Sequence, residues 1–271
     1  MLKHSVLLIL FQIIFLSGCA KSINFYSDVE HLKYNSTIDG TISKPEGDGP
    51  FPAVVLMHGC SGLVNSTKQA LNAHSDNLVS NGFVTLILNS FTKRGKSDSV
   101  CGDTEALEEA HNYRQYDAFH ALKYLQTQPY VDKNNIFLMG QSNGGGVALS
   151  IAKFGADKDL FPDKPKFQGI VAFYPPCGYI SNIFQSEIIS PLLILTGEKD
   201  DWTPPAECLS AKKYVTGSNY EVIVYKNAYH SFDLFISEQT YAGHTVGGNY
   251  IARNDSHKQM LNWFLRHLSQ H

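Results

Sequence analysis

The chain has 271 residues, of which 43% are hydrophobic and 17% are charged, and its formal net charge is −3. This composition is typical of one globular α/β domain with a sizeable core. The near-neutral balance argues against nucleic acid as a partner, because binding to phosphates requires an excess of basic side chains. The chain contains no internal repeat and no low-complexity tract.

Residues 1–18 have the features of a targeting segment. An apolar run over 6–16 follows a lysine and a histidine, and it is too short to span a bilayer but typical of a secretory signal peptide. The run ends in LSGC at 16–19, which resembles the lipobox of bacterial lipoproteins. We therefore predict a signal peptide, acylation of Cys19 and export to a membrane-anchored position. The alanine that follows favours the outer membrane, facing the periplasm; an ordinary signal peptide with an incidental cysteine is the alternative.

Strand-like and helix-like segments alternate along the rest of the chain. A linker over 19–36 is expected to precede one domain over 37–271. The predicted strands cover residues 37–42, 53–57, 83–88, 136–139, 169–174, 192–196 and 221–225, and the predicted helices cover 67–80, 104–128, 147–152, 205–215 and 256–268. This alternation predicts a mostly parallel sheet with helices on both faces. Most of the strands are continuous apolar runs, as burial on both faces requires.

The most informative stretch is the pentapeptide GQSNG at 140–144, between a β-prone apolar run and a helix-like segment. In such a strand–turn–helix the serine sits at a strained apex, and glycine is needed two positions before and after it. The pattern alone is weak because glycine and serine are common, so its context has to support it. Ser142 is the candidate nucleophile. The N–H of Asn143, at the start of the helix, is a candidate oxyanion donor.

Candidate partners for this serine follow later strands. Asp200 lies in a G-x-x-D turn after the strand at 192–196, and His230 directly follows the last predicted strand. Both lie just past the carboxyl end of a strand, where sites in open α/β sheets form. The order Ser, Asp, His is that of one hydrolase fold, and we predict the triad Ser142, Asp200, His230. Asp201 competes for the role of the acid, and the turn favours Asp200.

The loop HGCSG at 58–62 follows the strand at 53–57. In this architecture that loop supplies the second oxyanion donor, for which the N–H of Cys60 is the candidate. His58 could be proposed as a base, but we interpret it as a loop-stabilising residue because His230 fills that role. Cys60 could be proposed as a nucleophile, but it lacks the sharp turn.

Four cysteines remain after the predicted processing, and export would place them in an oxidising compartment. Cys60 and Cys101 follow two consecutive strands, and Cys177 and Cys208 follow two others. Because consecutive strands usually lie side by side, we predict disulfides 60–101 and 177–208. Four buried free thiols are the alternative.

The motifs together resemble the dienelactone hydrolase family of the α/β-hydrolase superfamily. The resemblance is carried by GPFPAVVLMHGCSG, GQSNGG, GEKDDWTP and YHSF, and it extends from about residue 37 to the C-terminal helix. It implies the α/β-hydrolase fold and a serine hydrolase that cleaves carboxylic esters through an acyl-enzyme. The founding members carry cysteine where Ser142 stands, which favours general ester hydrolysis over action on dienelactone.

Other charged and aromatic residues have two interpretations each. Phe91, Tyr174, Trp202, Tyr229 and Phe232 either line an apolar pocket or pack in the core. Lys93, Arg94 and Lys96 could meet an anionic substrate, but we interpret them as a solvated loop. Arg114 and Asp117 have helical spacing and are expected to form an ion pair.

The expected partners are a small-molecule ester and, through the lipid, a membrane. No cofactor or metal is predicted, because H-E-x-x-H is absent and the pair His267/His271 lies at the chain's end. A peptidase or acyltransferase on the same fold is an alternative. The other alternative is a non-catalytic surface-binding lipoprotein with a vestigial triad.

Overall fold

The structure is a computed structural model of the chain. It describes residues 20–27, 36–96, 99–159, 161–179, 188–213, 215 and 219–269. The predicted signal peptide and Cys19 lie outside the described residues, so export, acylation and membrane anchoring stay predictions. None of the helices in the described ranges is both long and apolar enough to cross a membrane.

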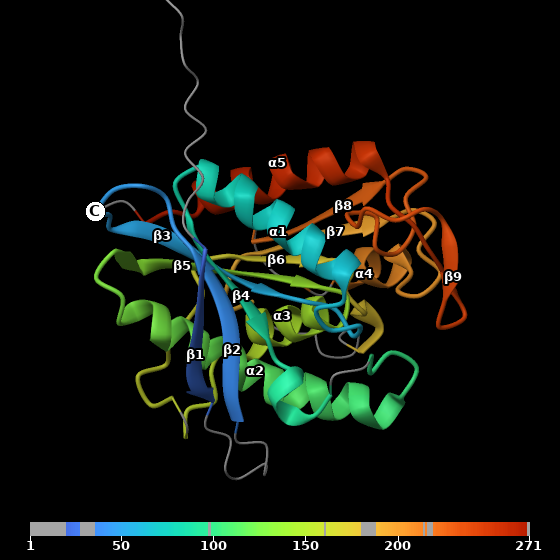
Figure 1. Cartoon of the computed structure of the whole chain (residues 1–271). Helices are drawn as coiled ribbons and strands as arrows, with labels where there is room; N and C mark the ends of the chain where they lie inside the picture. Colours follow the sequence, from blue (N-terminus) through green and yellow to red (C-terminus); the bar gives the residue numbers. More distant parts are fainter. Residues whose placement is uncertain are drawn as a thin grey trace, which may run out of the picture.

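An eight-stranded sheet forms the centre of the molecule, in the order β1-β2-β4-β3-β5-β6-β7-β8 (Figure 1). The strands are β1 (Lys21–Ser27), β2 (Ser36–Ser43), β3 (Phe51–Met57), β4 (Val84–Asn89), β5 (Val131–Gln141), β6 (Ile170–Phe173), β7 (Leu192–Gly197) and β8 (Tyr220–Tyr225). Neighbours from β4 to β8 are parallel, whereas β1 and β2 pair in antiparallel fashion. The predicted mostly parallel sheet is therefore confirmed.

The stretch expected to be a linker contains the edge strand β1, which pairs with β2 from Lys21↔Ile42 to Ser27↔Ser36. Most of its side chains are exposed or half-buried. Ile23 and Phe25 pack against the core from alternate positions, and main-chain hydrogen bonds to β2 complete the attachment. The alternation in KSINFYS is confined to these two side chains, which is shorter than the run by which a strand is recognised.

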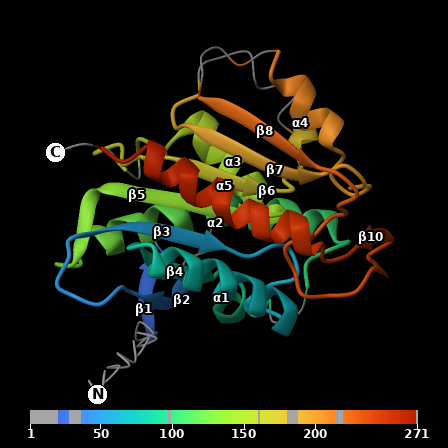
Figure 2. The ribbon, with the colours of Figure 1, turned by 90° about the horizontal axis from the view of Figure 1, so that it is seen from above.

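Helices cover both faces of the sheet, as predicted. They are α1 (Asn65–Ser80), α2 (Thr104–Gln126), α3 (Asn143–Phe154), α4 (Pro205–Ala211) and α5 (Tyr250–Arg266). One apolar cluster joins α1 and α5 to the sheet, and a second joins α2, α3 and α4 to it. Figures 1 and 2 show α1 and α5 together on one side and α2 with α3 on the other. Helix α5 begins six residues earlier than expected, because the Asn249 side chain caps it by accepting from the Ala252 N–H.

The carboxyl ends of the parallel strands meet at one edge of the sheet, where β3, β5 and β7 lead into the loops that carry the predicted site. A short hairpin that the sequence did not reveal lies at this edge, formed by β9 (Gln239–Tyr241) and β10 (His244–Val246). An isolated bridge joins Val246 of the hairpin to His230. The hairpin is thereby tied to the loop of the candidate base.

Candidate active site

A sharp turn between β5 and α3 presents Ser142. This serine has φ 50° and ψ −115°, in a region that non-glycine residues rarely occupy. A Cβ on Gly140 would lie 2.1 Å from the Gly144 carbonyl oxygen, and one on Gly144 would lie 2.5 Å from the His58 carbonyl oxygen. The turn therefore needs both glycines, as the motif predicts.

The structure brings Ser142, His230 and Asp200 into one hydrogen-bonded chain. His230 Nε2 lies 3.0 Å from Ser142 Oγ, and His230 Nδ1 lies 2.9 Å from Asp200 Oδ2. The His230 and Asp200 side chains are both buried. Such a chain can pass a proton from a hydroxyl to an imidazole whose tautomer a carboxylate fixes.

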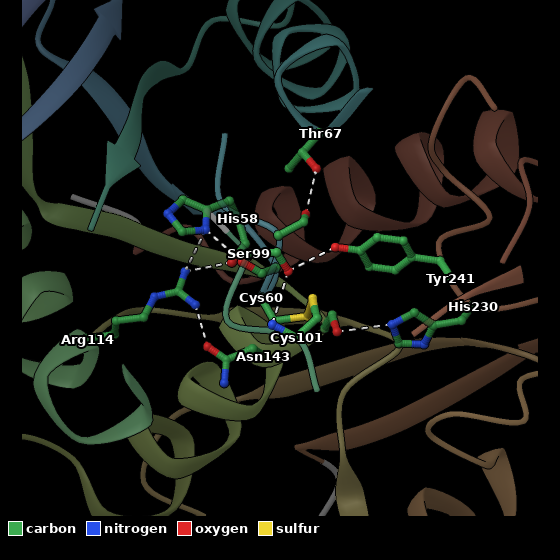
Figure 3. The surroundings of a disulfide bond; sticks show 12 residues. His58, Cys60, Thr67, Ser99, Cys101, Arg114, Asn143, His230 and Tyr241 are labelled. Carbon is green, nitrogen blue, oxygen red and sulfur yellow. Dashed lines mark hydrogen bonds between the residues drawn. A yellow bond between two sulfur atoms is a disulfide. The ribbon is translucent and has the colours of Figure 1, made fainter. Parts of the chain in front are cut away.

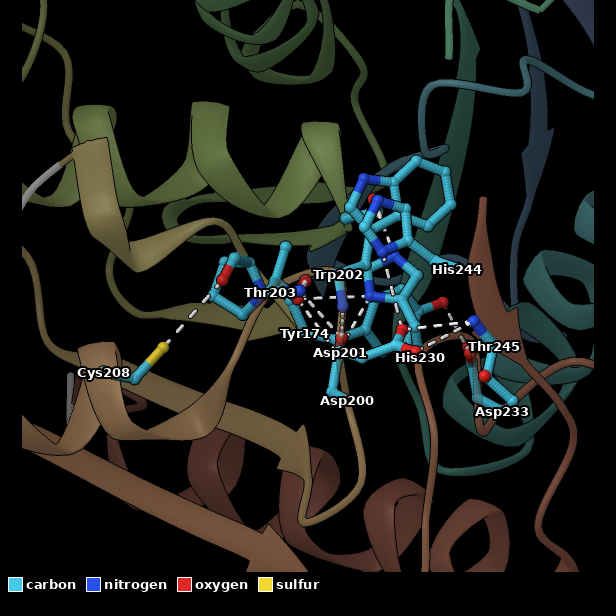
Figure 4. Close-up of polar contacts among 12 residues, drawn as sticks. Tyr174, Asp200, Asp201, Trp202, Thr203, Cys208, His230, Asp233, His244 and Thr245 are labelled. Carbon is cyan, nitrogen blue, oxygen red and sulfur yellow. Dashed lines mark hydrogen bonds and ion pairs between the residues drawn. The ribbon is translucent and has the colours of Figure 1, made fainter. Parts of the chain in front are cut away.

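Asp200 rather than Asp201 faces the histidine (Figure 4). The Asp200 carboxylate also accepts hydrogen bonds from the N–H groups of Trp202 and Thr203. Asp201 is exposed, and its carboxylate accepts from the Thr245 N–H at 3.1 Å. The two adjacent carboxylates therefore point to different surroundings.

Thr203 is part of this arrangement and was not anticipated. Its Oγ1 lies 2.9 Å from Asp200 Oδ2, 3.1 Å from His230 Nδ1 and 3.1 Å from the Tyr174 carbonyl oxygen. The Thr203 hydroxyl can donate its proton to Asp200 Oδ2 or to the Tyr174 carbonyl oxygen. Thr203 therefore helps to hold the Asp200 carboxylate in place. The signal in the sequence is the spacing D-x-x-T, in which an Asp side chain folds back on the following turn.

The two candidate oxyanion donors adjoin Ser142. A Cβ on Gly59 would lie 3.3 Å from Ser142 Cβ, so the loop after β3 runs against the candidate nucleophile. Cys60 lines the same cavity as Ser142. Asn143 is the first residue of α3, and the N–H groups in the first turn of a helix have no acceptor within it.

Both predicted disulfides, Cys60–Cys101 and Cys177–Cys208, are formed, which confirms the pairing. The first lies in the wall of the cavity beside Ser142. The Cys60 carbonyl also accepts from the Val100 N–H at 3.0 Å. The loop that carries one candidate donor is therefore fastened to the segment before α2 (Figure 3).

The cavity over Ser142 has a volume of about 250 Å³. Its larger side chains are Val64, Tyr174, Trp202, Leu234, Ile236, Tyr241 and Val246. The His230 imidazole, the Cys60–Cys101 disulfide, Gly59 and several hydroxyl and amide groups complete the lining. No lysine, arginine, aspartate or glutamate is among the described residues that line it. Of the five candidate aromatic residues, Tyr174 and Trp202 line the cavity, and Phe91 and Phe232 pack in the core. Tyr229 instead has the Lys199 ammonium over its ring.

The expected Arg114–Asp117 ion pair is not formed, and that prediction was wrong. The Asp117 carboxylate binds both terminal nitrogens of Arg94, each at 2.8 Å. Arg94 was expected to lie in a solvated loop. Its side chain is instead largely buried and forms an ion pair. The other two cations are more exposed: Lys93 lies 3.7 Å from Asp39, and Lys96 lies 3.1 Å from Glu109. Spacing along α2 could not reveal a partner on a different element.

His58 is buried in the loop after β3, and its Nδ1 donates to the Gly59 carbonyl at 2.7 Å. Burial, and then the nearby Arg114 guanidinium, hold the pKa of His58 well below its ordinary value. A neutral His58 imidazole that forms a hydrogen bond within its own loop agrees with the predicted loop-stabilising role. His230, not His58, contacts Ser142 Oγ.

A second buried carboxylate lies below the turn and was also missed. Asp233 accepts hydrogen bonds from His74 Nε2 at 2.7 Å, Gln141 Nε2 at 2.5 Å and the Tyr174 hydroxyl at 2.6 Å. Burial alone would raise the pKa of Asp233, but these hydrogen bonds lower it below its usual value. The Tyr174 ring packs against His230, with ring centroids 4.5 Å apart. Through Tyr174, this network is therefore in contact with the candidate base.

No group of three or more His, Cys, Asp or Glu side chains in the described ranges could hold a metal ion.

The sequence model of the dienelactone hydrolase family matches residues 38–268. Esterase EstD of Thermotoga maritima is 24% identical, over 56% of this chain and 33% of its own length. The peroxisomal succinyl-coenzyme A thioesterase of Mus musculus is 30% identical, over 43% of this chain and 24% of its own. The matched part of this chain thus spans a third or less of either relative.

Solved structures share the fold at low sequence identity. A dienelactone hydrolase from Anabaena variabilis is 16% identical, with a TM-score of 0.66 over 92% of this chain and 99% of that chain. The dienelactone hydrolase-like promiscuous phosphotriesterase P91, from metagenomic libraries, is 19% identical, with a TM-score of 0.67 over 93% and 100%. Because the family model covers most of the chain, this protein belongs to the dienelactone hydrolase family and is a hydrolase with the α/β-hydrolase fold.

Proposed function

We propose that this protein is a serine esterase that cleaves small, uncharged carboxylic esters through an acyl-enzyme. The observation that carries the proposal is the chain of contacts from Asp200 through His230 to Ser142 Oγ at the floor of a cavity. An esterase and a thioesterase among the relatives support hydrolysis of an acyl bond.

The reaction proceeds in two stages. His230 Nε2 takes the proton of Ser142 Oγ as the oxygen attacks the ester carbonyl, and Asp200 stabilises the imidazolium that forms. The N–H groups of Cys60 and Asn143 donate to the oxyanion. His230 then gives this proton to the leaving-group oxygen as its bond to the acyl carbon breaks, and the alcohol departs. Water, deprotonated by the same imidazole, attacks the acyl-enzyme and releases the acid.

The lining of the cavity supports an uncharged substrate. Apolar side chains form most of the wall, and the described lining offers no cation for a substrate carboxylate. An anionic acyl chain would lose its hydration without gaining a partner. The volume of about 250 Å³ suits a short acyl or a single aryl group.

A fluorophosphonate probe should label Ser142, and Ser142→Ala should abolish the labelling. The variant should also lose at least about 10³-fold of the activity on p-nitrophenyl butyrate, because the Ser142 hydroxyl is the group on which the proposed acyl-enzyme forms. Labelling at a different residue, or an alanine variant with most of its activity, would contradict the proposal. An absence of labelling in the wild type would favour the non-catalytic alternative. Peptide and acyl-acceptor substrates then separate a peptidase or acyltransferase.

The acid is tested by a matched pair of variants. Asp200→Asn should approach a loss of about 10⁴-fold in kcat, because the imidazole loses its tautomer and the stabilisation of its charged form. Asp201→Asn should cost less than about tenfold, because its carboxylate faces Thr245 and solvent. Both are measured on one ester. A larger loss for Asp201→Asn would mean that the acid is misassigned.

The charge preference is tested with two acyl chains of similar length. We expect kcat/KM for p-nitrophenyl butyrate to exceed that for p-nitrophenyl hemisuccinate by at least about tenfold, because the hemisuccinate carboxylate must be desolvated in an uncharged wall. Equal or faster cleavage of the hemisuccinate would show that the acyl group meets a cation or stays in solvent.

The two disulfides should differ in their effect on activity but not in their effect on stability. Their sequence separations of 41 and 31 residues are similar, and loop entropy gives each a stabilisation of about 4 kcal/mol. C60S/C101S and C177S/C208S should therefore lower the thermal midpoint by similar amounts. Only C60S/C101S should reduce kcat, by about tenfold, because Cys60 carries a proposed oxyanion donor. An equal loss of kcat in both variants would contradict a local effect.

A further inference from the structure

Arg114, on α2, is a completely buried cation without a carboxylate partner in the described part of the chain. The nearest acid on its own helix, Asp117, is held by Arg94. Its Nε is buried with no hydrogen-bond partner among the described residues. Burial lowers the pKa of Arg114 to about 10, so the guanidinium is still charged at neutral pH. A buried charge that no carboxylate contacts directly is costly, even though the nearby Asp117 offsets part of the cost. This indicates that the cation has a role beyond packing.

The guanidinium contacts both segments that carry the proposed oxyanion donors (Figure 3). One terminal nitrogen donates to Asn143 Oδ1 at 2.5 Å, and the other donates to the His58 carbonyl oxygen at 2.6 Å. Asn143 itself carries one donor N–H. His58 lies two residues before Cys60, which carries the other.

The shape of this side chain suits a spacer between two segments. A guanidinium presents its donors in a rigid planar fork, so two acceptors bound to it are held at a fixed separation. The segments approach closely at this point, because a Cβ on Gly144 would lie 2.5 Å from the same His58 carbonyl oxygen. The Phe91 ring, 5.1 Å from the guanidinium carbon, packs over the cation.

We propose that Arg114 is a positioning residue for acyl transfer, which sets the spacing of the two oxyanion donors and places a buried positive charge behind them. The inference rests on the proposed function, since that reaction is the one that develops an oxyanion between Cys60 and Asn143. Arg114 keeps all its protons and forms no covalent bond. The positive charge of Arg114 stabilises the negative charge that develops on the oxyanion of the tetrahedral intermediate. Its effect therefore falls on kcat more than on KM.

The test compares Arg114→Met and Arg114→Lys with the control Arg94→Lys, which alters another buried arginine that does not contact the donor segments. The full chain is used, and active enzyme is counted by fluorophosphonate titration, so that misfolded protein does not enter kcat. The readouts are kcat and KM on p-nitrophenyl butyrate, and the inhibition constant of phenylboronic acid, which forms a tetrahedral adduct with a reactive serine.

Arg114→Met should lower kcat by about 10²-fold and weaken the boronic acid by a similar factor, with KM changed by less than about threefold. Arg114→Lys should recover at least about fivefold of the lost kcat, because it keeps the charge but cannot span both acceptors. Arg94→Lys should keep kcat within about threefold of wild type even where it lowers the thermal midpoint.

An Arg114→Met variant with kcat near wild type, or with reduced kcat but unchanged boronic-acid affinity, would overturn the inference. If Arg114→Lys has no higher kcat than Arg114→Met, the proposed contribution of the charge is overturned. If the methionine variant does not fold, the lysine variant decides: it must lose kcat and boronic-acid affinity in parallel. A wild type that neither probe binds would sink the proposed function itself, whereas a labelled wild type with unaffected variants would sink only the role of Arg114.

Discussion

The strained turn at Ser142 is the constraint on which the rest of the site depends. Its positive φ exists because β5 and α3 meet with no space for a side chain at Gly140 or Gly144. The close approach at Gly144 also fixes the His58 carbonyl, and hence the path of the loop after β3. Such strain persists only where the surroundings over-determine it. Here the central strand β5 and the buried helix α3 supply that support.

Charge is distributed across this turn in a way that matches the proposed reaction. As Ser142 attacks, positive charge appears on His230 and negative charge appears on the former carbonyl oxygen. The buried carboxylate of Asp200 contacts the first of these centres, and the buried cation of Arg114 backs the segments proposed to hold the second. The other buried carboxylate of this region, Asp233, has three hydrogen-bond donors of its own on its oxygens. Fixed charges of this kind need no reorganisation during the reaction.

The local features of the site were predictable from the sequence, and the non-local ones were not. The serine turn, the G-x-x-D turn and the two disulfides follow from short-range chemistry and from the adjacency of consecutive strands, and the structure has each of them. The partner of Asp117 was misassigned because helical spacing favoured Arg114, whereas packing brought Arg94 from the loop after β4. The edge strand and the β9–β10 hairpin were missed because few of their side chains are buried.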